Sequence, residues 1–454
     1  MAVQETSPIL AELERVVGGE HVLAPPPAQY LSDETGRGLR GTALAAVLPG
    51  SAEETAAVVA VCYEGGVAVT PRGGGTGVVG GAVPDGGVVL SLERLNRVRS
   101  FDPLLWRIEV EAGVTTGRLH ELAAGSGLMF PPDPGASEQS QIGGNIATNA
   151  GGPHAFRYGV TRRWVTGLEA VLAPGRLVRL GGAARKDVAG YDLIGLLTGS
   201  EGTLGVVTAA TLRLVPAPEA RHVVAAVYGS DRAACEAVER ILGSGIEAAA
   251  VELLDATAAR LAGRGFPGEL APGALLLAEA DGSEAEAAER RDALVEALAE
   301  GSAAATVEVA DARAAWRWRD ELSFRLAAVE GGKLSEDVAV PLDRLADLVE
   351  AVPEIGRRHG LTGLSFGHAG DGNMHSSFLV DPSDPERFAA ALAAREELLA
   401  LAVELGGTIA AEHGLGSVKS GRLGDQWPPE AVAAHRAIKA ALDPKGLLNP
   451  GKKQ

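Results

Sequence analysis

The chain has 454 residues, of which 41 are Lys or Arg and 59 are Asp or Glu, so its formal net charge is −18. This length exceeds the usual size of one domain, and the apolar fraction of 46% allows a buried core. We therefore expect at least two globular domains, and we exclude wholesale disorder and, because no basic stretch offsets the acidic charge, nucleic-acid binding.

The N-terminal residues do not have the pattern of a targeting segment. The first twenty residues include Glu5, Glu12 and Glu14 and lack the apolar run of a signal peptide. No other segment reaches the ~18 uninterrupted apolar residues that span a bilayer. Only two cysteines occur, Cys62 and Cys235, and neither lies in a cluster that binds zinc or iron–sulfur. We expect a cytoplasmic protein that does not span a membrane.

Up to residue 215 the sequence alternates short β-rich runs with glycine clusters, which predicts a mixed α+β domain. A helix is predicted over 51–66, because Ser51 and Glu54 form a capping-box pattern and Gly65 is a stop signal. Strands are predicted over 66–70, 86–92, 106–113 and 204–215.

Prolines at 216 and 218 interrupt the last of these strands, and the composition then changes. Segments rich in Ala, Glu and Arg alternate with strand-like runs, which indicates a second α+β domain that begins near residue 217. Helices are predicted over 231–242, 283–300, 342–359 and 384–405.

The loop at 71–84, PRGGGTGVVGGAVP, imitates a dinucleotide-binding fingerprint. A Rossmann unit needs a helix to begin at these glycines, because the helix N-terminus holds the pyrophosphate. Five Gly and Pro residues fill that span, and each costs about 1 to 3 kcal/mol in a helix. We therefore reject the Rossmann interpretation. The alternatives are an ordinary turn and an irregular nest of backbone N–H groups that binds phosphate.

Two further segments are rich in Gly and Asn, at 131–161 and 186–208, and allow close approach to a flat polar ligand. Together with the 71–84 loop, they resemble the flavin domain of the vanillyl-alcohol oxidase/p-cresol methylhydroxylase superfamily, in the branch of D-lactate dehydrogenases, glycolate oxidase flavin subunits and D-2-hydroxyglutarate dehydrogenases. The resemblance implies a p-cresol-methylhydroxylase-type FAD-binding domain over 28–216. It also implies a substrate and metal domain over 217–454, whose tail (410–454) returns to the flavin.

The resemblance implies non-covalent FAD, since the 71–84 loop lacks the histidine to which some superfamily members attach flavin. The implied pyrophosphate contacts are Arg72, Gly73, Gly74, Gly75, Thr76 and Gly77. The implied flavin contacts are Pro132, Asp133, Ser140, Ile142, Gly143, Gly144, Asn145, Thr148 and, from the closing motif DPKGLLNPGK, Asn449. The implied nucleotide contacts are Glu201, Gly202, Gly205 and Val207.

Two histidines flank Asp371-Gly372, a dipeptide that favours a two-residue type I′ hairpin turn. Counting outward from this turn pairs His368 with His375. Directly opposed residues have their Cβ atoms ~5 Å apart, which allows two imidazoles to share a metal ion. The alternative is that one histidine packs in the core or caps the turn.

Glu412 and His413, in EHGLG, complete the pattern. The family resemblance makes His368, His375 and Glu412 ligands of a divalent metal, Zn, Mn or Fe, and His413 the general base. Two imidazoles and one carboxylate leave open coordination positions, as a catalytic metal requires. Adjacent residues face opposite ways in a regular strand, so we expect Gly414 and Gly416 to bend the chain.

A substrate carboxylate is expected to bind in the segment 316–341. By resemblance, Arg319 is the carboxylate-binding arginine, Ser323 stands where the family motif carries a hydroxyl, and Lys333 is a second cation. The arginine fork fits a carboxylate in bidentate fashion. The alternative is a solvated helix face, in which Arg317, Arg319 and Asp320 pair at the surface.

The resulting hypothesis is an FAD-dependent 2-hydroxy-acid dehydrogenase. The metal lowers the pKa of the hydroxyl, His413 takes its proton, and C2 delivers hydride to flavin N5. Ser377 stands where the hydroxyglutarate enzymes carry Asn, which favours D-lactate or glycolate over D-2-hydroxyglutarate.

There are three competing interpretations. A metallohydrolase does not account for the three glycine-rich segments, and a non-redox flavoprotein related to alkyl-glycerone-phosphate synthase would lack a matching GHAGDGNMH and EHGLG pair. The third is a flavin subunit active only with an iron–sulfur partner. The expected partners are the 2-hydroxy acid and an electron acceptor, which could be an electron-transfer flavoprotein, a quinone, a cytochrome or that iron–sulfur subunit. A homodimer is an alternative assembly.

Overall fold

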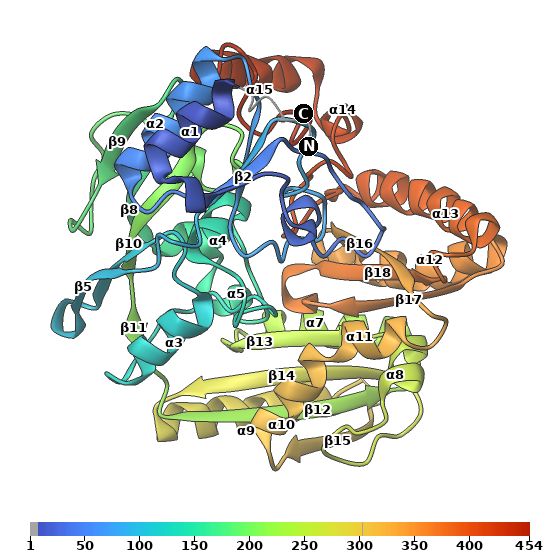
Figure 1. The fold of residues 1–454 in the computed structure, drawn as a ribbon. Coiled ribbons are helices and arrows are strands. Elements are labelled where there is room, and N and C mark those ends of the chain that lie inside the picture. Colours follow the sequence, from blue (N-terminus) through green and yellow to red (C-terminus); the bar gives the residue numbers. More distant parts are fainter. Residues whose placement is uncertain (1–7, 302) are drawn as a thin grey trace. The chain divides into compact units, whose positions relative to one another are not determined.

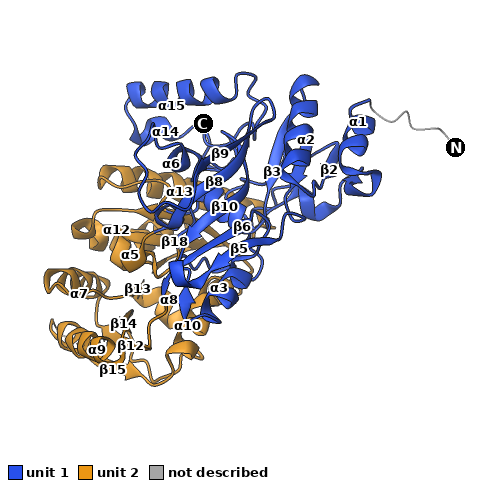
Figure 2. Ribbon diagram, turned by 90° about the vertical axis from the view of Figure 1, so that its left-hand side faces the viewer, with its two compact units in different colours: residues 1–151, 160–216, 412–454 blue, residues 152–159, 217–411 orange. Residues whose placement is uncertain are grey.

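A computed structural model describes residues 8–301 and 303–454 (Figure 1). The chain divides into two compact units, which Figure 2 shows in blue and orange. Unit 1 contains residues 1–151, 160–216 and 412–454, and unit 2 contains residues 152–159 and 217–411. Residues 1–7, part of the stretch in which no signal peptide is predicted, lie outside the described residues.

Unit 1 contains a four-stranded sheet in the order β1-β2-β4-β3. Strands β2 (Ala45–Val47), β4 (Val88–Ser91) and β3 (Val69–Arg72) are parallel, and β1 (Val22–Leu23) is antiparallel to β2. Helices α1 (Pro8–Val17) and α2 (Ala52–Glu64) pack on this sheet through the apolar core that includes Leu13, Val58 and Val88. Leu448, near the C-terminus, forms a parallel bridge to Val69 and joins the same core.

A second sheet of unit 1 is antiparallel, in the order β5-β6-β10-β8-β9. Its inner face is apolar, with Ile108 and Leu212 paired across β6 and β10, and the short helix α4 (Ile142–Thr148) packs on these two strands. The opposite face carries charged side chains. The strands are β5 (Val98–Asp102), β6 (Arg107–Glu111), β8 (Val165–Leu172), β9 (Arg176–Gly181) and β10 (Val206–Arg213).

The remaining elements of unit 1 are short, apart from the 14-residue helix α15 (Pro429–Leu442), and lie outside its two larger sheets. They are η1 (Gly19–His21), η2 (Ala28–Leu31), η3 (Pro103–Leu105), α3 (Thr116–Ala124), the pair β7 (Leu128–Met129) and β11 (Val215–Pro216), α4, η4 (Thr161–Trp164), α6 (Leu193–Leu197), α14 (Leu423–Gln426) and α15.

Unit 2 is built on one seven-stranded antiparallel sheet, in the order β15-β12-β14-β13-β17-β18-β16. Helices α8, α10 and α11 pack on one face, where Leu254, Trp318 and Phe366 lie in the core. Helices α7, α9, α12 and α13 pack on the other face, where the Tyr228 hydroxyl donates to the carbonyl of Leu298 at 2.7 Å. Residues on alternate positions of one strand therefore belong to different layers.

The strands of unit 2 are β12 (Ala220–Tyr228), β13 (Ala250–Leu254), β14 (Ala274–Gly282), β15 (Ala303–Val309), β16 (Lys333–Ala339), β17 (Thr362–Gly367) and β18 (Asn373–Leu379). The helices are α5 (Ala155–Tyr158), α7 (Asp231–Gly243), α8 (Ala256–Ala262), α9 (Glu284–Ala299), α10 (Ala312–Asp320), α11 (Leu322–Ala327), η5 (Leu342–Arg344), α12 (Leu345–Arg358), η6 (Ala369–Asp371) and α13 (Pro385–Glu404).

The structure confirms the predicted helices and the mixed α+β class. Ser51 caps α2 by accepting a hydrogen bond from the N–H of Glu54, although the Glu54 carboxylate bonds to Gly50 rather than to Ser51. No helix begins at the glycines of the 71–84 loop, which joins β3 directly to β4, so the rejection of a Rossmann unit is confirmed.

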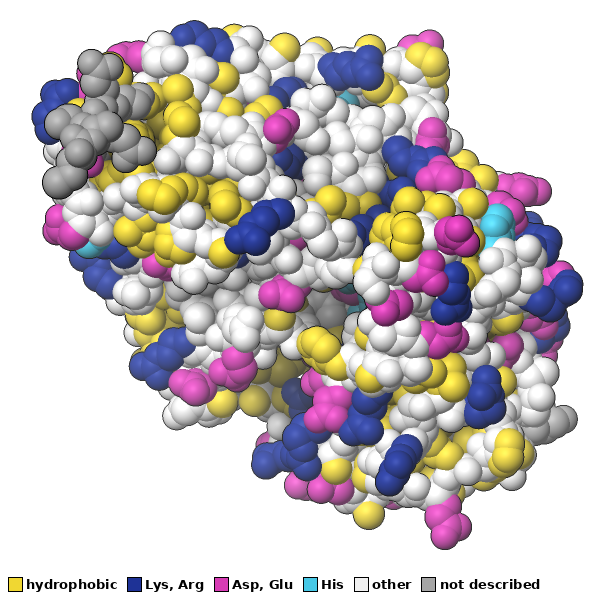
Figure 3. Space-filling model, turned by 45° about the vertical axis from the view of Figure 1, so that its right-hand side comes forward, with side chains coloured by type: hydrophobic (Ala, Val, Ile, Leu, Met, Phe, Trp, Pro, Cys, Tyr) yellow, Lys and Arg dark blue, Asp and Glu magenta, His cyan; other side chains and the backbone are white. Residues whose placement is uncertain are grey.

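On the face that Figure 3 presents, basic side chains are scattered among acidic ones. Within residues 8–301 and 303–454, every helix is too short or too polar to cross a membrane.

Candidate functional site

The glycine-rich loop of unit 1 packs tightly on the segment that leads into α4. A Cβ atom added at Gly74 would overlap the carbonyl oxygen of Gln139, and one added at Gly73 would lie 3.3 Å from the Gly144 nitrogen. At Gly75 the backbone is left-handed (φ +73), and the guanidinium of Arg72 lies against it. Side chains at these positions would push the 73–77 loop away from the segment before α4, so only glycine allows the two backbones to pack this closely.

Open space lies beside the same backbone. A Cβ added at Gly81 or Gly144 would have no atom within 4 Å. The buried oxygens Gln141 Oε1 and Asn449 Oδ1 have no hydrogen-bond partner among the residues that the structure describes. Buried polar atoms are normally paired, so these oxygens are suited to a polar ligand. This combination of open space and unpaired acceptors fits a flat polar cofactor.

A buried hydrogen-bond network fixes the start of α4. The Asn145 amide donates to the Thr116 hydroxyl at 2.6 Å, and the hydroxyls of Thr116 and Ser140 are 2.7 Å apart. Asn145 and Ser140 are predicted flavin contacts, whereas Thr116 was missed because it lies in a separate segment. The other residues predicted to contact the flavin lie nearby. Ile142 and Pro132 are buried, and Asp133 is half-buried. Gly143 packs on Ala112, and the Thr148 hydroxyl donates to the Gly144 carbonyl.

Glu201 connects three segments of unit 1. Its carboxylate accepts the N–H groups of Leu415 and Gly416 at 2.9 and 2.8 Å, and Lys453 Nζ lies 3.1 Å away. Its backbone carbonyl accepts the Asn449 amide at 2.7 Å. The other residues predicted to contact the nucleotide are Gly202, Gly205 and Val207. Gly202 lies against Pro71, while Gly205 and Val207 pack in the apolar interior. Glu201 thus anchors the C-terminal tail within unit 1.

Glu412 and His413 follow in unit 1 and lie in irregular backbone rather than in a strand. Glu412 Oε1 and His413 Nε2 are 3.6 Å apart. Gly414 has a φ of +83° and Gly416 has a φ of +52°. The expectation that the chain bends at these glycines is confirmed.

In unit 2, the predicted register of the histidine hairpin is wrong. Phe366, and not His368, lies opposite His375 in the β17–β18 pair. A type I′ turn needs positive φ at both central residues, whereas Asp371 lies in the 3₁₀ turn η6 and only Gly372 of this dipeptide has positive φ. The loop is therefore longer than two residues, and the Asn373 N–H donates to the His368 carbonyl at 3.1 Å.

The two imidazoles nevertheless meet. The ring centres of His368 and His375 are 5.3 Å apart and the ring planes are nearly perpendicular, at 85°. Phe366 packs against His375, with ring centres 5.5 Å apart. Both histidines are buried. Their neutral nitrogens are suitable ligands for a divalent ion.

Glu252 binds both His368 and Arg319. The carboxylate is buried in β13; its Oε1 lies 2.6 Å from His368 Nδ1, and its Oε2 accepts from Arg319 Nε at 2.6 Å. Burial acts to raise the pKa of Glu252, but the charge of Arg319 and the hydrogen bonds from Arg319 and His368 overcome this and lower the pKa to about 2. Arg319 is itself buried, so the predicted alternative of a solvated arginine is wrong.

Sequence reasoning missed Glu252 and Asp337. Glu252 is the one charged residue in the apolar run 248–254, AAAVELL, and such an isolated buried charge is a signal. Asp337 lies beside His375 in the sheet, with Oδ1 3.9 Å from His375 Nδ1. Its Oδ1 accepts the Asn373 amide and its Oδ2 accepts the Ala411 N–H, at 2.7 and 2.9 Å.

Lys333 lies on the same face of the sheet as Asp337, two side-chain positions away. Its ammonium is 4.9 Å from the centre of the Phe366 ring, and burial lowers the pKa of Lys333 to about 8. Between Lys333 and Asp337, the Ser377 hydroxyl donates to Ser335 at 2.9 Å. Ser323 is exposed on α11.

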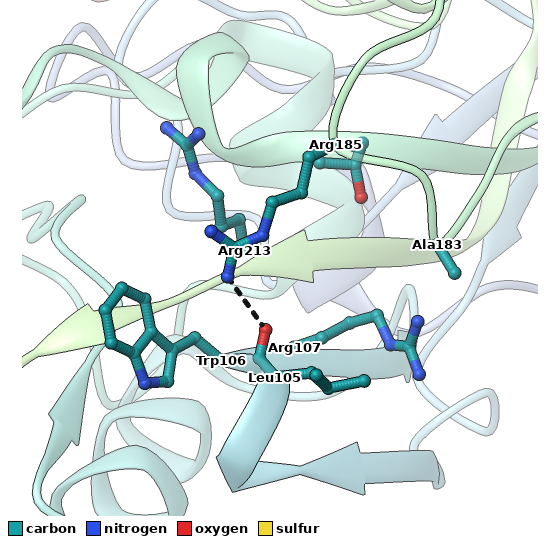
Figure 4. Close-up of a pocket in the computed structure, with 7 residues that line it drawn as sticks. Leu105, Trp106, Arg107, Ala183, Arg185 and Arg213 are labelled. Carbon is teal, nitrogen blue, oxygen red and sulfur yellow. Dashed lines mark hydrogen bonds between the residues drawn. The ribbon is translucent and has the colours of Figure 1, made fainter.

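The charged face of the antiparallel sheet in unit 1 contains a different set of residues. A cavity of about 110 Å³ lies there beside Trp106, Arg107 and Arg213, and Arg185 donates across it to the Leu105 carbonyl at 3.3 Å (Figure 4). An adjoining hollow of about 690 Å³ is lined by cross-strand ion pairs such as Arg99–Glu169, at 2.8 Å. These cavities contain none of the predicted site residues.

Comparison with known proteins places this geometry among flavoenzymes. The family "FAD linked oxidases, C-terminal domain" matches residues 217–453, and "FAD binding domain" matches residues 43–181. Glycolate oxidase subunit GlcD of Bacillus subtilis is 38% identical, covering 90% of this chain and 88% of that protein. D-lactate dehydrogenase of Archaeoglobus fulgidus is 36% identical, with 94% and 96% covered. D-2-hydroxyglutarate dehydrogenase of Xanthomonas citri is 37% identical, with 90% and 89% covered.

Among solved structures, p-cresol methylhydroxylase with substrate bound has a TM-score of 0.79 at 19% identity, covering 98% of this chain and 96% of that one. This likeness confirms the predicted fold.

The tight packing of Gly74 yields a test of the FAD cradle. In Gly74→Ala the new methyl group must displace the loop from Gln139, which costs about 1–3 kcal/mol. We expect FAD affinity to fall roughly tenfold or more, as measured by titrating the apoprotein with FAD. Gly424→Ala is the control, because its methyl group enters open space at an exposed position of α14, away from the residues assigned to the cofactor. Equal affinity in both variants would contradict the assignment of this loop to the cofactor.

Proposed function

Because the chain belongs to the family of FAD-linked oxidases, we propose that it is an FAD-dependent dehydrogenase that oxidises a small D-2-hydroxy acid to the 2-keto acid. D-Lactate and glycolate are the preferred substrates, and D-2-hydroxyglutarate is the alternative. FAD, held without a covalent bond, would supply the acceptor for the hydride that leaves C2 of the substrate.

The observation that carries the proposal is the buried cation beside the histidine pair. Arg319 is held within 3.3 Å of His368 by a carboxylate, and His368 lies against His375, so a guanidinium and two imidazoles form one cluster. A 2-hydroxy acid presents a carboxylate and a hydroxyl on adjacent carbons. Arginine binds the first group in bidentate fashion, and a metal on the imidazoles suits the second.

The donor set fits a divalent metal. His368, His375 and Glu412 would hold it, and the ion would supply a Lewis acid that lowers the pKa of the substrate hydroxyl. Glu412 is the residue after Ala411, whose N–H is bonded to Asp337 beside His375. Consecutive Cα atoms are about 3.8 Å apart, so the chain brings Glu412 near this group through covalent connection alone.

His413 is proposed to take the hydroxyl proton on one of its ring nitrogens. Its side chain is half-buried, and neutral imidazole is a suitable base at physiological pH. Arg319 holds the carboxylate so that the C2–H bond has one orientation. The surrounding apolar side chains, such as Phe366, exclude water from the developing keto acid.

The two serines next to His375 in the sheet, Ser377 and Ser335, favour small substrates. Ser377 is bonded to Ser335 and is short, so it does not supply the amide that the hydroxyglutarate enzymes carry at this position. We propose that Lys333, which lies on the same face of the sheet as His375 and whose pKa is lowered to about 8 by burial, assists in binding the anion.

The name of the Bacillus subtilis relative, a glycolate oxidase subunit, supports a second candidate in which this chain works only together with partner subunits. We propose an iron–sulfur protein as that partner. The isolated chain, assayed with an artificial electron acceptor, separates the two candidates, because turnover without a partner contradicts the second.

The direct test of the proposed function is anaerobic mixing of the FAD-loaded protein with D- and L-2-hydroxy acids. We expect D-lactate or glycolate to bleach the oxidised flavin absorbance, L-lactate to leave it unchanged, and a chelator-treated sample to react far more slowly while it stays yellow. If no 2-hydroxy acid bleaches the flavin, the proposed function is wrong.

Replacement of the proposed base gives a second test. In His413→Asn, flavin reduction by substrate should slow by roughly 10²–10⁴-fold, since general bases contribute about this factor, while FAD stays bound. His359→Asn is the control, because His359 pairs with Glu397 at 2.6 Å on the outside of unit 2. A reduction rate that is unchanged in His413→Asn removes the base assignment.

The lowered pKa of Lys333 predicts a pH dependence. The cation is present below a pH of about 8, so in the wild type KM should rise as pH increases through 8. Lys333→Met should raise KM roughly tenfold at pH 7 and abolish that rise, because a charged hydrogen bond is worth about 1.5–3 kcal/mol.

The same variant should be more stable than the wild type at pH 7. The folded-state pKa of Lys333 is below the unfolded value, so the folded state binds fewer protons between pH 8 and 10.5 and gains stability as pH rises there. The advantage of Lys333→Met in thermal unfolding should therefore shrink across that window. Lys445→Met, which also removes an ammonium near an aromatic ring, should leave KM unchanged.

A further inference from the structure

We propose that Glu252 is a positioning residue that fixes the ring tautomer of His368 and the orientation of Arg319 with the two oxygens of one carboxylate. This inference rests on the proposed function, in which His368 is a metal ligand and Arg319 binds the substrate. It adds a residue of β13 to the part of the site in which Arg319 lies on α10, His375 on β18 and His368 in the turn after β17.

Glu252 is buried, so its carboxylate cannot interact with solvent or form a surface ion pair. It lies in a central strand, paired with Leu277 on the neighbouring strand, and only 1% of it is exposed. An ionised carboxylate at such a depth is costly unless it is paired and hydrogen-bonded. Its partners are the two residues that the proposed reaction needs.

The contact with His368 determines which ring nitrogen carries the proton. A carboxylate only accepts hydrogen bonds, so Nδ1, 2.6 Å from Glu252 Oε1, must carry the hydrogen. The lone pair of the neutral ring is then on Nε2, which becomes the ligand atom. Metal-binding histidines commonly use a carboxylate on the other nitrogen in this way.

The contact with Arg319 determines how the guanidinium is turned. Nε and Nη2 both lie on Glu252 Oε2, at 2.6 and 2.5 Å, so one edge of the planar group is committed to the carboxylate. Nη2 is also 3.3 Å from His368 Nδ1. Because that nitrogen carries a hydrogen, this approach is a close packing contact and not a hydrogen bond. The contacts of Glu252 therefore fix the orientations of the Arg319 guanidinium and the His368 ring relative to each other.

Glu252→Gln tests this arrangement sharply. The amide oxygen of Gln can accept from Arg319, and the amide NH₂ then faces His368 Nδ1 as a donor. His368 must accept at Nδ1, which moves its own hydrogen to Nε2, the proposed ligand atom. We expect the affinity of the chelator-stripped, FAD-loaded protein for Co²⁺ to fall 10–100-fold, the range found for such outer carboxylates, as measured by calorimetric titration.

A second readout follows Arg319. The dissociation constant of the substrate, obtained from the concentration dependence of flavin bleaching, should rise in the same variant, whereas the flavin spectrum should not change. Glu336→Gln is the matched control. Glu336 is equally buried and accepts from Arg395 at 2.8 Å, but it lies on the other face of the sheet from His375. It should leave the Co²⁺ affinity unchanged.

Unchanged Co²⁺ and substrate affinities in Glu252→Gln overturn the inference while the proposed function stands, provided that the wild type is still bleached. If Glu252→Gln does not fold, the double variant Glu252→Gln/Arg319→Gln removes both buried charges together. It should again bind Co²⁺ 10–100-fold more weakly, and wild-type Co²⁺ affinity in the double variant overturns the inference.

Discussion

The burial of one ionised carboxylate, Glu252, governs the arrangement of unit 2 around the histidine pair. A charge in the centre of an apolar strand cannot persist without partners, so Arg319 and His368 must reach it from separate elements. Apolar replacements of such groups are often as stable, so stability alone does not account for the trio. What the trio provides is a fixed geometry: a cation and an imidazole that cannot reorient independently.

A different constraint determines the arrangement of unit 1. Here glycines allow two backbone segments to pack closely, whereas in unit 2 a buried charge fixes the arrangement. Gly73 and Gly74 lie against the segment before α4, and Gly416 packs on the Val79 carbonyl. Glu201 then secures the tail through the N–H groups of Leu415 and Gly416. Glu412 and His413 precede these anchored residues directly. The two proposed functional side chains of the tail are therefore held between Glu201 on one side and Ala411, bonded to Asp337, on the other.

The sequence allowed much of this to be predicted, because glycine motifs and helix signals are local. The helices over 231–242 and 384–405 and the irregular 71–84 loop are as expected. The hairpin register was wrong because Asp371-Gly372 was assumed to form the whole turn, whereas a 3₁₀ turn adds residues to the loop. Glu252 was missed because its partners are more than sixty residues away in the chain, and no local pattern reveals such a contact.

Residues 152–159 belong to unit 2, although the residues on both sides of them in the chain belong to unit 1. The sequence patterns did not indicate this crossing of the chain. The chain leaves unit 1 after Gly151, soon after α4, and enters unit 2. There His154 contacts the buried Glu279 at 3.0 Å, Tyr158 donates to the buried Asp281 at 2.6 Å, and Phe156 packs on Gly370 in the turn after His368. A side chain at Gly370 would collide with this ring. The turn that carries His368 is thus packed, within unit 2, on a segment that is far from it in the sequence, so its position depends on residues that no pattern around His368 reveals.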